Sequence, residues 1–166
     1  RVGYCQGNFN SDNCAAGGYT LDYGPFGFCE LFDPRFQPWT GGGEHFSFFN
    51  QPSAAEINFK TFCSSLSPLL SESKHDFEKL EQIEKDFSEL MNKELMKMWA
   101  NKLGLEHYNE TLINEFFNLM VISKADYTIL FRKLSEIPDN LDSLKDSFYL
   151  PINDELNNRW EVWLEN

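Results

Sequence analysis

Three residues near the start of the chain have the chemistry of a metal–phosphate site. Asp12, Asn13 and Asp22 lie within 11 residues of one another, in a stretch with glycines at positions 7 and 24. The oxygens of Asn13 and Asp22 are the hard ligands that hold magnesium on phosphates. Asp12 is a carboxylate beside them, suited to orient or deprotonate a hydroxyl. Asp-Asn and Asp-Tyr-Gly are also common turn formers, so spacing alone leaves structural turns as an alternative.

The run Asp22-Tyr23-Gly24 resembles the metal-binding tripeptide of protein kinases. In ordinary kinases, however, the catalytic Asp precedes the metal-binding Asn by five positions. Here Asp12 and Asn13 are adjacent, so the ordinary kinase signature is not met.

Longer motifs give a more specific resemblance, to the selenoprotein O family. The motifs are the run at 7–13, Asp-Tyr-Gly-Pro-Phe-Gly-Phe at 22–28, Asp33-Pro34, Phe-Phe-Asn-Gln-Pro at 48–52, Asn58 and Leu-Ser-Pro-Leu-Leu at 66–70. The resemblance is dense over residues 3–70. It continues more weakly through 102–105 and 125–128 to about Arg132.

This resemblance implies a kinase-fold protein adenylyltransferase. Asn13 and Asp22 would hold magnesium, or manganese, on ATP, and Asp12 would act on a Ser, Thr or Tyr hydroxyl of a protein substrate. The hydroxyl would attack the α-phosphate, so that AMP is transferred. Two alternatives stay open: transfer of the γ-phosphate as in a kinase, and an inactive helical or nucleotide-binding piece. The family is intracellular, mitochondrial in eukaryotes and cytoplasmic in bacteria.

The expected fold is α+β and mostly α, a kinase-like C-terminal lobe. Nine of the ten glycines fall in the first 43 residues. Residues 1–51 are therefore expected to form loops with short strands, and 52–166 a helical lobe. The resemblance implies that the loops within 1–51 are catalytic and activation-type loops. Only six residues precede Gly7, so we expect a piece of a longer protein that lacks the N-terminal lobe, with its nucleotide-covering loop and Lys–Glu pair.

The net charge of the chain argues against two classes of partner. Fourteen basic and 26 acidic residues give a formal net charge of −12, which argues against nucleic acid or an anionic membrane as a partner. No run approaches the roughly 18 apolar residues that a membrane span needs.

The four cysteines, at positions 5, 14, 29 and 63, lack zinc-site spacing and are expected to be mostly buried thiols. Cys29 is the one whose position suggests redox chemistry. Relatives often carry a regulatory Cys at the position that aligns with Pro38, so redox control through that residue is not expected here. The C-terminal Cys or selenocysteine typical of the family is absent too.

Around the predicted site, a strand at Tyr19–Leu21 is expected to lead into Asp22. Gln6 is expected to support the loop formed by the run at 7–13, called here the motif loop. Asn58 is either a core amide or a hydrogen-bonding brace for that loop. Aromatic residues of the loop 24–43 either anchor it or form a docking surface for a protein substrate.

Apolar periodicity predicts helices in the second half of the chain. They run over 52–70, from Ser71 or Ser73 to Gly104, from Asn109 or Thr111, over 125–137, briefly within 139–148, and from Pro151 onward. The second is expected to bury a stripe made of Phe77, Leu80, Ile83, Phe87, Leu90, Met91, Leu95 and Met98.

Overall fold

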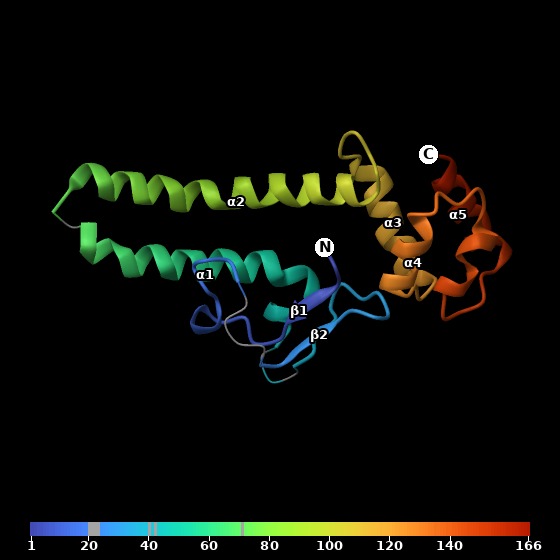
Figure 1. Ribbon diagram of the computed structural model, residues 1–166, viewed down its shortest axis with the longest axis horizontal. Helices are drawn as coiled ribbons and strands as arrows, with labels where there is room; N and C mark the ends of the chain where they lie inside the picture. Colours follow the sequence, from blue (N-terminus) through green and yellow to red (C-terminus); the bar gives the residue numbers. More distant parts are fainter. Residues whose placement is uncertain (20–23, 40, 42, 71) are drawn as a thin grey trace. The chain divides into compact units, whose positions relative to one another are not determined.

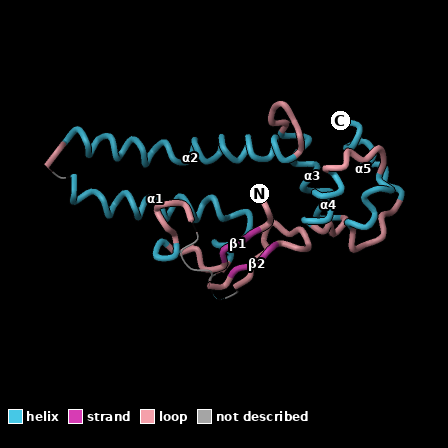
Figure 2. Tube along the Cα trace, in the orientation of Figure 1, coloured by secondary structure: helices cyan, strands magenta, loops and turns pink. Residues whose placement is uncertain are grey.

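The computed structural model of the protein describes residues 1–19, 24–39, 41, 43–70 and 72–166. Figures 1 and 2 show a mostly helical chain with one small sheet, as predicted. The helices are α1 (Gln51–Leu66), α2 (Lys74–Lys102), α3 (Glu110–Ile122), α4 (Tyr127–Leu134) and α5 (Asp154–Glu165). The kinase-like lobe and the division at residue 51 stay predictions.

The chain forms two compact units. The first, called here the hairpin unit, comprises Cys5–Gly27 and Arg35–Leu95, and contains α1 and most of α2. The second, called the terminal unit, comprises Arg1–Tyr4, Phe28–Pro34 and Met96–Asn166, and contains α3, α4 and α5.

The sheet pairs β1 (Tyr4–Gln6) with β2 (Phe26–Phe28). The Cys29 amide donates to the Gly3 carbonyl at 2.7 Å, and the Gly7 amide donates to the Pro25 carbonyl at 2.6 Å. Because the partner numbers fall as the residue numbers rise, the two strands are antiparallel. β1 thus leads directly into the motif loop.

Helix α1 ends earlier than predicted. The α-helix stops at Leu66 and continues as a 3-10 turn over Ser67–Leu70. Pro68 explains the change, because proline lacks an N–H and its ring clashes with the carbonyl four residues before it. Within the hairpin unit, α1 and α2 lie side by side, and the rings of Phe59 and Phe87 stack with centroids 4.6 Å apart (Figure 1).

The predicted buried stripe of α2 is wrong. Ala100 is the only buried residue of the helix, whereas Ile83 and Leu90 are 55% and 58% exposed. Figure 2 shows α2 as one long, straight helix. A helix covered along one narrow seam buries only the side chains of that seam, and periodicity does not tell how wide the seam is.

The ends of the helices follow capping chemistry. Gly104, with φ +72°, closes α2, and the Leu105 amide returns to the Ala100 carbonyl at 2.9 Å, as expected of a glycine C-cap. The side chains of Asn109, Asp126 and Asn153 each accept a backbone N–H of the first turn of α3, α4 and α5. α4 and α5 therefore begin two to three residues later than predicted.

Aromatic side chains fill the core of the terminal unit. Phe116 of α3 is fully buried, and its ring lies 4.6 Å from that of Trp163 and 5.5 Å from that of Phe131. Trp160 of α5 is also fully buried, 6.1 Å from Phe116. The helical segment predicted within 139–148 is a 3-10 helix over Leu141–Ser147 that contributes Leu141 and Leu144 to this core.

We predict that Phe116→Ala lowers the free energy of unfolding by about 3–5 kcal/mol, because it leaves a cavity among packed rings. Urea unfolding measures the change. Ile122→Ala in the same helix, where the side chain is 40% exposed, is the control and should cost far less. Equal losses for the two variants would contradict the assignment of Phe116 to the core.

Ile137 gives a second prediction, because it combines a β-branched side chain with φ +54°. Its side chain is 85% exposed, so a substitution loses little packing. Asn tolerates this backbone conformation better, and Ile137→Asn should stabilise the protein by about 1 kcal/mol in urea unfolding. Ile129→Asn, within α4, should destabilise it instead. A loss of stability in Ile137→Asn would show that this backbone is not strained.

Candidate functional site

The motif loop ends in a short 3-10 turn, Ser11–Asn13. Two backbone bonds close it: the Asn13 amide donates to the Asn10 carbonyl at 3.0 Å, and the Cys14 amide donates to the Ser11 carbonyl at 3.4 Å. Asp12 lies in the first turn with an exposed side chain. The turn therefore presents the predicted base to solvent, where a substrate hydroxyl can reach it.

The amide of Asn13 is oriented by the same loop. Its Nδ2 donates to the Asn8 carbonyl at 3.0 Å. Oδ1 is the atom of an Asn amide that can ligate a cation, and the bond to Asn8 uses only the nitrogen. The orientation fits the metal-ligating role predicted for Asn13.

Gly7 begins the loop where two segments come close together. A Cβ at this position would lie 2.5 Å from the Pro25 carbonyl oxygen and 3.1 Å from Cγ of Pro38. No side chain fits there, so the motif glycine is required by close backbone approach. Pro38 thus packs against the start of the motif loop.

Helix α1 supports the loop through two amide side chains. Asn58 is 7% exposed, and its Nδ2 donates to the Phe9 carbonyl at 2.9 Å. Of the two alternatives for Asn58, the brace is confirmed. Gln51 was not predicted to have a role, yet it bonds both backbone groups of Gln6: Nε2 donates to its carbonyl at 3.0 Å, and Oε1 accepts from its amide at 3.2 Å.

The structure places two of the three predicted site residues. Asp12 and Asn13 are neighbours on one turn. Asp22, and Thr20 and Leu21 of the predicted strand, lie outside the described residues, so the pairing of Asn13 with Asp22 stays a prediction. In the described part of the chain, no cluster of three or more His, Cys, Asp or Glu side chains could hold a metal ion.

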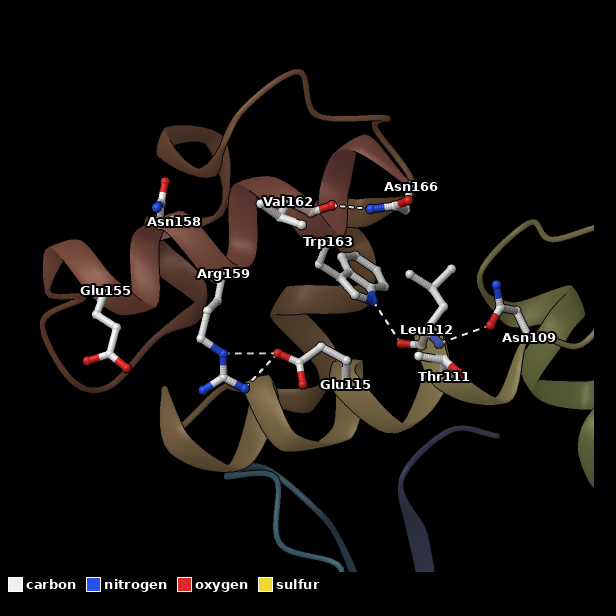
Figure 3. A pocket seen from close by; sticks show the side chains of 10 residues that line it. All are labelled: Asn109, Thr111, Leu112, Glu115, Glu155, Asn158, Arg159, Val162, Trp163 and Asn166. Carbon is white, nitrogen blue, oxygen red and sulfur yellow. Dashed lines mark hydrogen bonds and ion pairs between the residues drawn. The ribbon is translucent and has the colours of Figure 1, made fainter.

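A separate cleft of about 500 Å³ lies in the terminal unit, between α3 and α5 (Figure 3). Arg159 donates from Nε and from a terminal nitrogen to one oxygen of Glu115, at 3.0 and 2.6 Å. Trp163 Nε1 donates to the Leu112 carbonyl at 2.9 Å. These contacts join the two helices, and we assign the cleft no chemistry.

The cysteines differ sharply in exposure. Cys5, Cys29 and Cys63 are buried, as expected, and Cys14 is exposed. Burial raises the pKa of the Cys29 thiol, and the Asp33 and Asp126 carboxylates raise it further, against a backbone hydrogen bond that lowers it. A buried, protonated thiol is a poor nucleophile, so the suggestion of redox chemistry at Cys29 has no support in its surroundings.

Part of the loop 24–43 is anchored in the terminal unit. Phe32 is 2% exposed and stacks on Phe117 and Tyr127, with ring centroids 6.0 Å away in each case. Its amide donates to the Ala125 carbonyl at 2.8 Å. The anchoring alternative is confirmed for Phe32, while Phe26 and Phe28 of the same loop are exposed.

Comparison with known proteins identifies the family to which the chain belongs. The sequence profile of the family described as protein adenylyltransferase SelO matches residues 1–165. The chain belongs to the SelO family. The run at 7–13, one of the motifs that resemble this family, forms the loop described above.

Curated relatives of this SelO chain are named protein nucleotidyltransferase YdiU. One, from Flavobacterium johnsoniae, is 31% identical over 98% of the chain and 33% of its own length. Another, from Aromatoleum aromaticum, is 34% identical over 90% of the chain and 29% of its own length. A third, from Brevibacillus brevis, is 37% identical over 81% of the chain and 28% of its own length. The SelO chain thus spans about a third of the length of the relatives it matches.

Replacing the brace tests its importance. Asn58→Leu keeps the branched shape of the side chain but leaves the Phe9 carbonyl without this donor. We predict a loss of about 1–3 kcal/mol in stability and faster amide hydrogen exchange over residues 8–14. Ser64→Ala, at an exposed position of α1, is the control. Unchanged exchange in Asn58→Leu would show that the loop holds its shape without α1.

Thiol alkylation tests the cysteine environments. With iodoacetamide at neutral pH, Cys14 should react first because it is exposed, while Cys5, Cys29 and Cys63 should react only after unfolding. Mass spectrometry of peptides at increasing times gives the four rates. Alkylation of Cys29 as fast as Cys14 in the folded protein would contradict the burial described here.

Proposed function

We propose that the protein is a protein adenylyltransferase, which transfers AMP from ATP to Ser, Thr or Tyr hydroxyls of other proteins. The observation that carries the proposal is the match of the SelO profile to residues 1–165. The name of its relatives, protein nucleotidyltransferase, supports it. The helical part would then correspond to the C-terminal lobe of a kinase-like fold.

In this proposal Asp12 acts as the general base. Its carboxylate accepts the proton of the substrate hydroxyl while the hydroxyl oxygen attacks the α-phosphorus of ATP. A new P–O bond joins AMP to the protein, and the bond to the bridging oxygen breaks to release pyrophosphate. The exposed position of Asp12 on the Ser11–Asn13 turn suits a macromolecular substrate.

Asn13 and Asp22 would hold the divalent cation, magnesium or manganese. The orientation of the Asn13 amide, fixed by its bond to the Asn8 carbonyl, supports its part in this set. When bound, the cation supplies positive charge against the phosphate oxygens. The same bond ties the turn that carries Asp12 to Asn8.

The partners in this proposal are ATP and hydroxyl-bearing proteins inside the cell, without nucleic acid or membrane. We expect the cytoplasm in a bacterium and the mitochondrion in a eukaryote. The net charge of −12 supports the exclusion of nucleic acid and of anionic membrane surfaces. In the described residues, no helix combines the length and apolarity that crossing a membrane requires.

Transfer from labelled ATP tests the proposal. The full-length protein is incubated with magnesium, a mixture of hydroxyl-bearing proteins and ATP labelled at either the α- or the γ-phosphate. We predict that only the α-label becomes covalently bound. Asp12→Asn should lower the rate about 10²–10⁴-fold through loss of the base, and Asp22→Asn should abolish transfer. Glu89→Gln, an exposed carboxylate of α2, is the control.

Each other outcome contradicts the proposal. Covalent γ-label would indicate a kinase that uses the same three residues. If neither label is transferred while ATP binds, the loop serves nucleotide binding alone. Full activity in Asp12→Asn would remove the assigned base.

A further inference from the structure

A groove adjoins Asp12 in the hairpin unit, between the motif loop and the helices α1 and α2. Its volume is about 540 Å³, within the range of small-ligand sites. The loop contributes Asp12, Cys14, Ala15 and Ala16 to its wall. The groove therefore begins at the carboxylate proposed to receive the proton of the substrate.

The lining of this groove is mainly apolar. Phe59 and Phe62 of α1 and Phe87 and Met91 of α2 form much of it, and Phe62 is 42% exposed. Asp12 is the only acidic side chain in the lining, and among its described residues there is no Lys or Arg. A phosphate group would find no cation there and would meet the Asp12 carboxylate, so the groove does not suit the triphosphate.

The three polar side chains that α1 contributes to the groove are already used locally. Asn58 Nδ2 donates to the Phe9 carbonyl, Thr61 Oγ1 to the Ile57 carbonyl at 3.0 Å, and Ser65 Oγ to the Phe62 carbonyl at 2.7 Å. These bonds leave few directional donors for the edge of a purine ring. The lining favours a hydrocarbon or aromatic side chain, which needs contact area rather than hydrogen bonds.

The charge around the groove favours a basic partner. The hairpin unit contains six basic and twelve acidic residues, a formal net charge of −6. Such a surface attracts positively charged segments and repels acidic ones. A segment with basic residues beside one large apolar residue complements both the negative charge of the hairpin unit and the apolar lining of the groove.

We propose that this groove selects the protein substrate, by binding a large apolar side chain that lies near the hydroxyl residue in a segment with basic flanks. The proposal rests on the proposed function, because Asp12 must be the base for the hydroxyl to lie at the groove. In an extended segment, residues two positions apart point to the same side, about 7 Å apart along the chain. The apolar residue is therefore expected within three positions of the hydroxyl.

A peptide panel tests this selection in the full-length protein. Each peptide has one Ser in a Lys- and Ala-containing background, with Leu or Phe placed from three positions before it to three after it. The matched peptide has Ala only. Transfer of the α-label is measured as a function of peptide concentration. At the favoured position, the apolar peptide should have a KM about tenfold lower than its Ala counterpart.

Two substitutions in α1 separate the groove from the general surface. Phe62→Glu places a charge in the groove and should raise the KM of the apolar peptide about tenfold, with little effect on the Ala peptide. Ile57→Glu adds the same charge at a neighbouring side chain, 63% exposed, that does not line the groove. It should leave the ratio of the two KM values unchanged. Equal ratios in the protein and in Phe62→Glu would overturn the proposal.

A binding measurement tests the groove independently of AMP transfer. Cys14 lines the groove and is exposed, so a bound apolar peptide should slow its alkylation at least threefold, and Phe62→Glu should remove this protection. Protection without AMP transfer would retain the groove and reject the adenylyltransferase. AMP transfer with no preference among peptides would retain the enzyme and reject the groove. Slow alkylation of Cys14 without peptide would mean that another part of the full-length protein covers the groove, which also overturns the proposal.

Discussion

The candidate site depends on the hydrogen bonds that the backbone groups of the motif loop make. Buried carbonyl and amide groups need partners, and β1, the strand that leads into the loop, ends at Gln6. Helix α1 supplies them instead, through Asn58 at the Phe9 carbonyl and Gln51 at both backbone groups of Gln6. The turn that carries Asp12 and Asn13 is thereby tied to a rigid element, which is what a base and a metal ligand require.

The same helix gives the loop a second neighbour of a different kind. Asn58 faces the loop backbone, while Phe59 and Phe62 face the groove that begins at Asp12. The turn proposed to be catalytic and the groove proposed to bind the substrate therefore share one support. In the two proposals, the position of α1 relative to the loop would govern both the recognition of a protein segment and the activation of its hydroxyl. This shared helix links the two proposals.

Sequence predicted the local features well and the packing less well. The caps at Asn109 and Gly104 depend on residues within one turn, and local chemistry is enough to find them. The exposure of Ile83 and Leu90 depends on how much of α2 other elements cover, which periodicity does not encode. The candidate site residues were predicted from the chemistry and spacing of Asp12, Asn13 and Asp22 and from a family resemblance. Gln51 was missed as a support because a glutamine that bonds distant backbone leaves no pattern of spacing.

The central claim is that Asn13 and Asp22 form one metal site that Asp12 adjoins. The most direct test is binding of Mn²⁺ and ATP to the full-length protein, followed by electron paramagnetic resonance. The account predicts that Asn13→Ala and Asp22→Asn each weaken Mn²⁺ binding more than tenfold, whereas Asp12→Asn retains it. Unchanged Mn²⁺ binding in Asn13→Ala and Asp22→Asn would contradict the account.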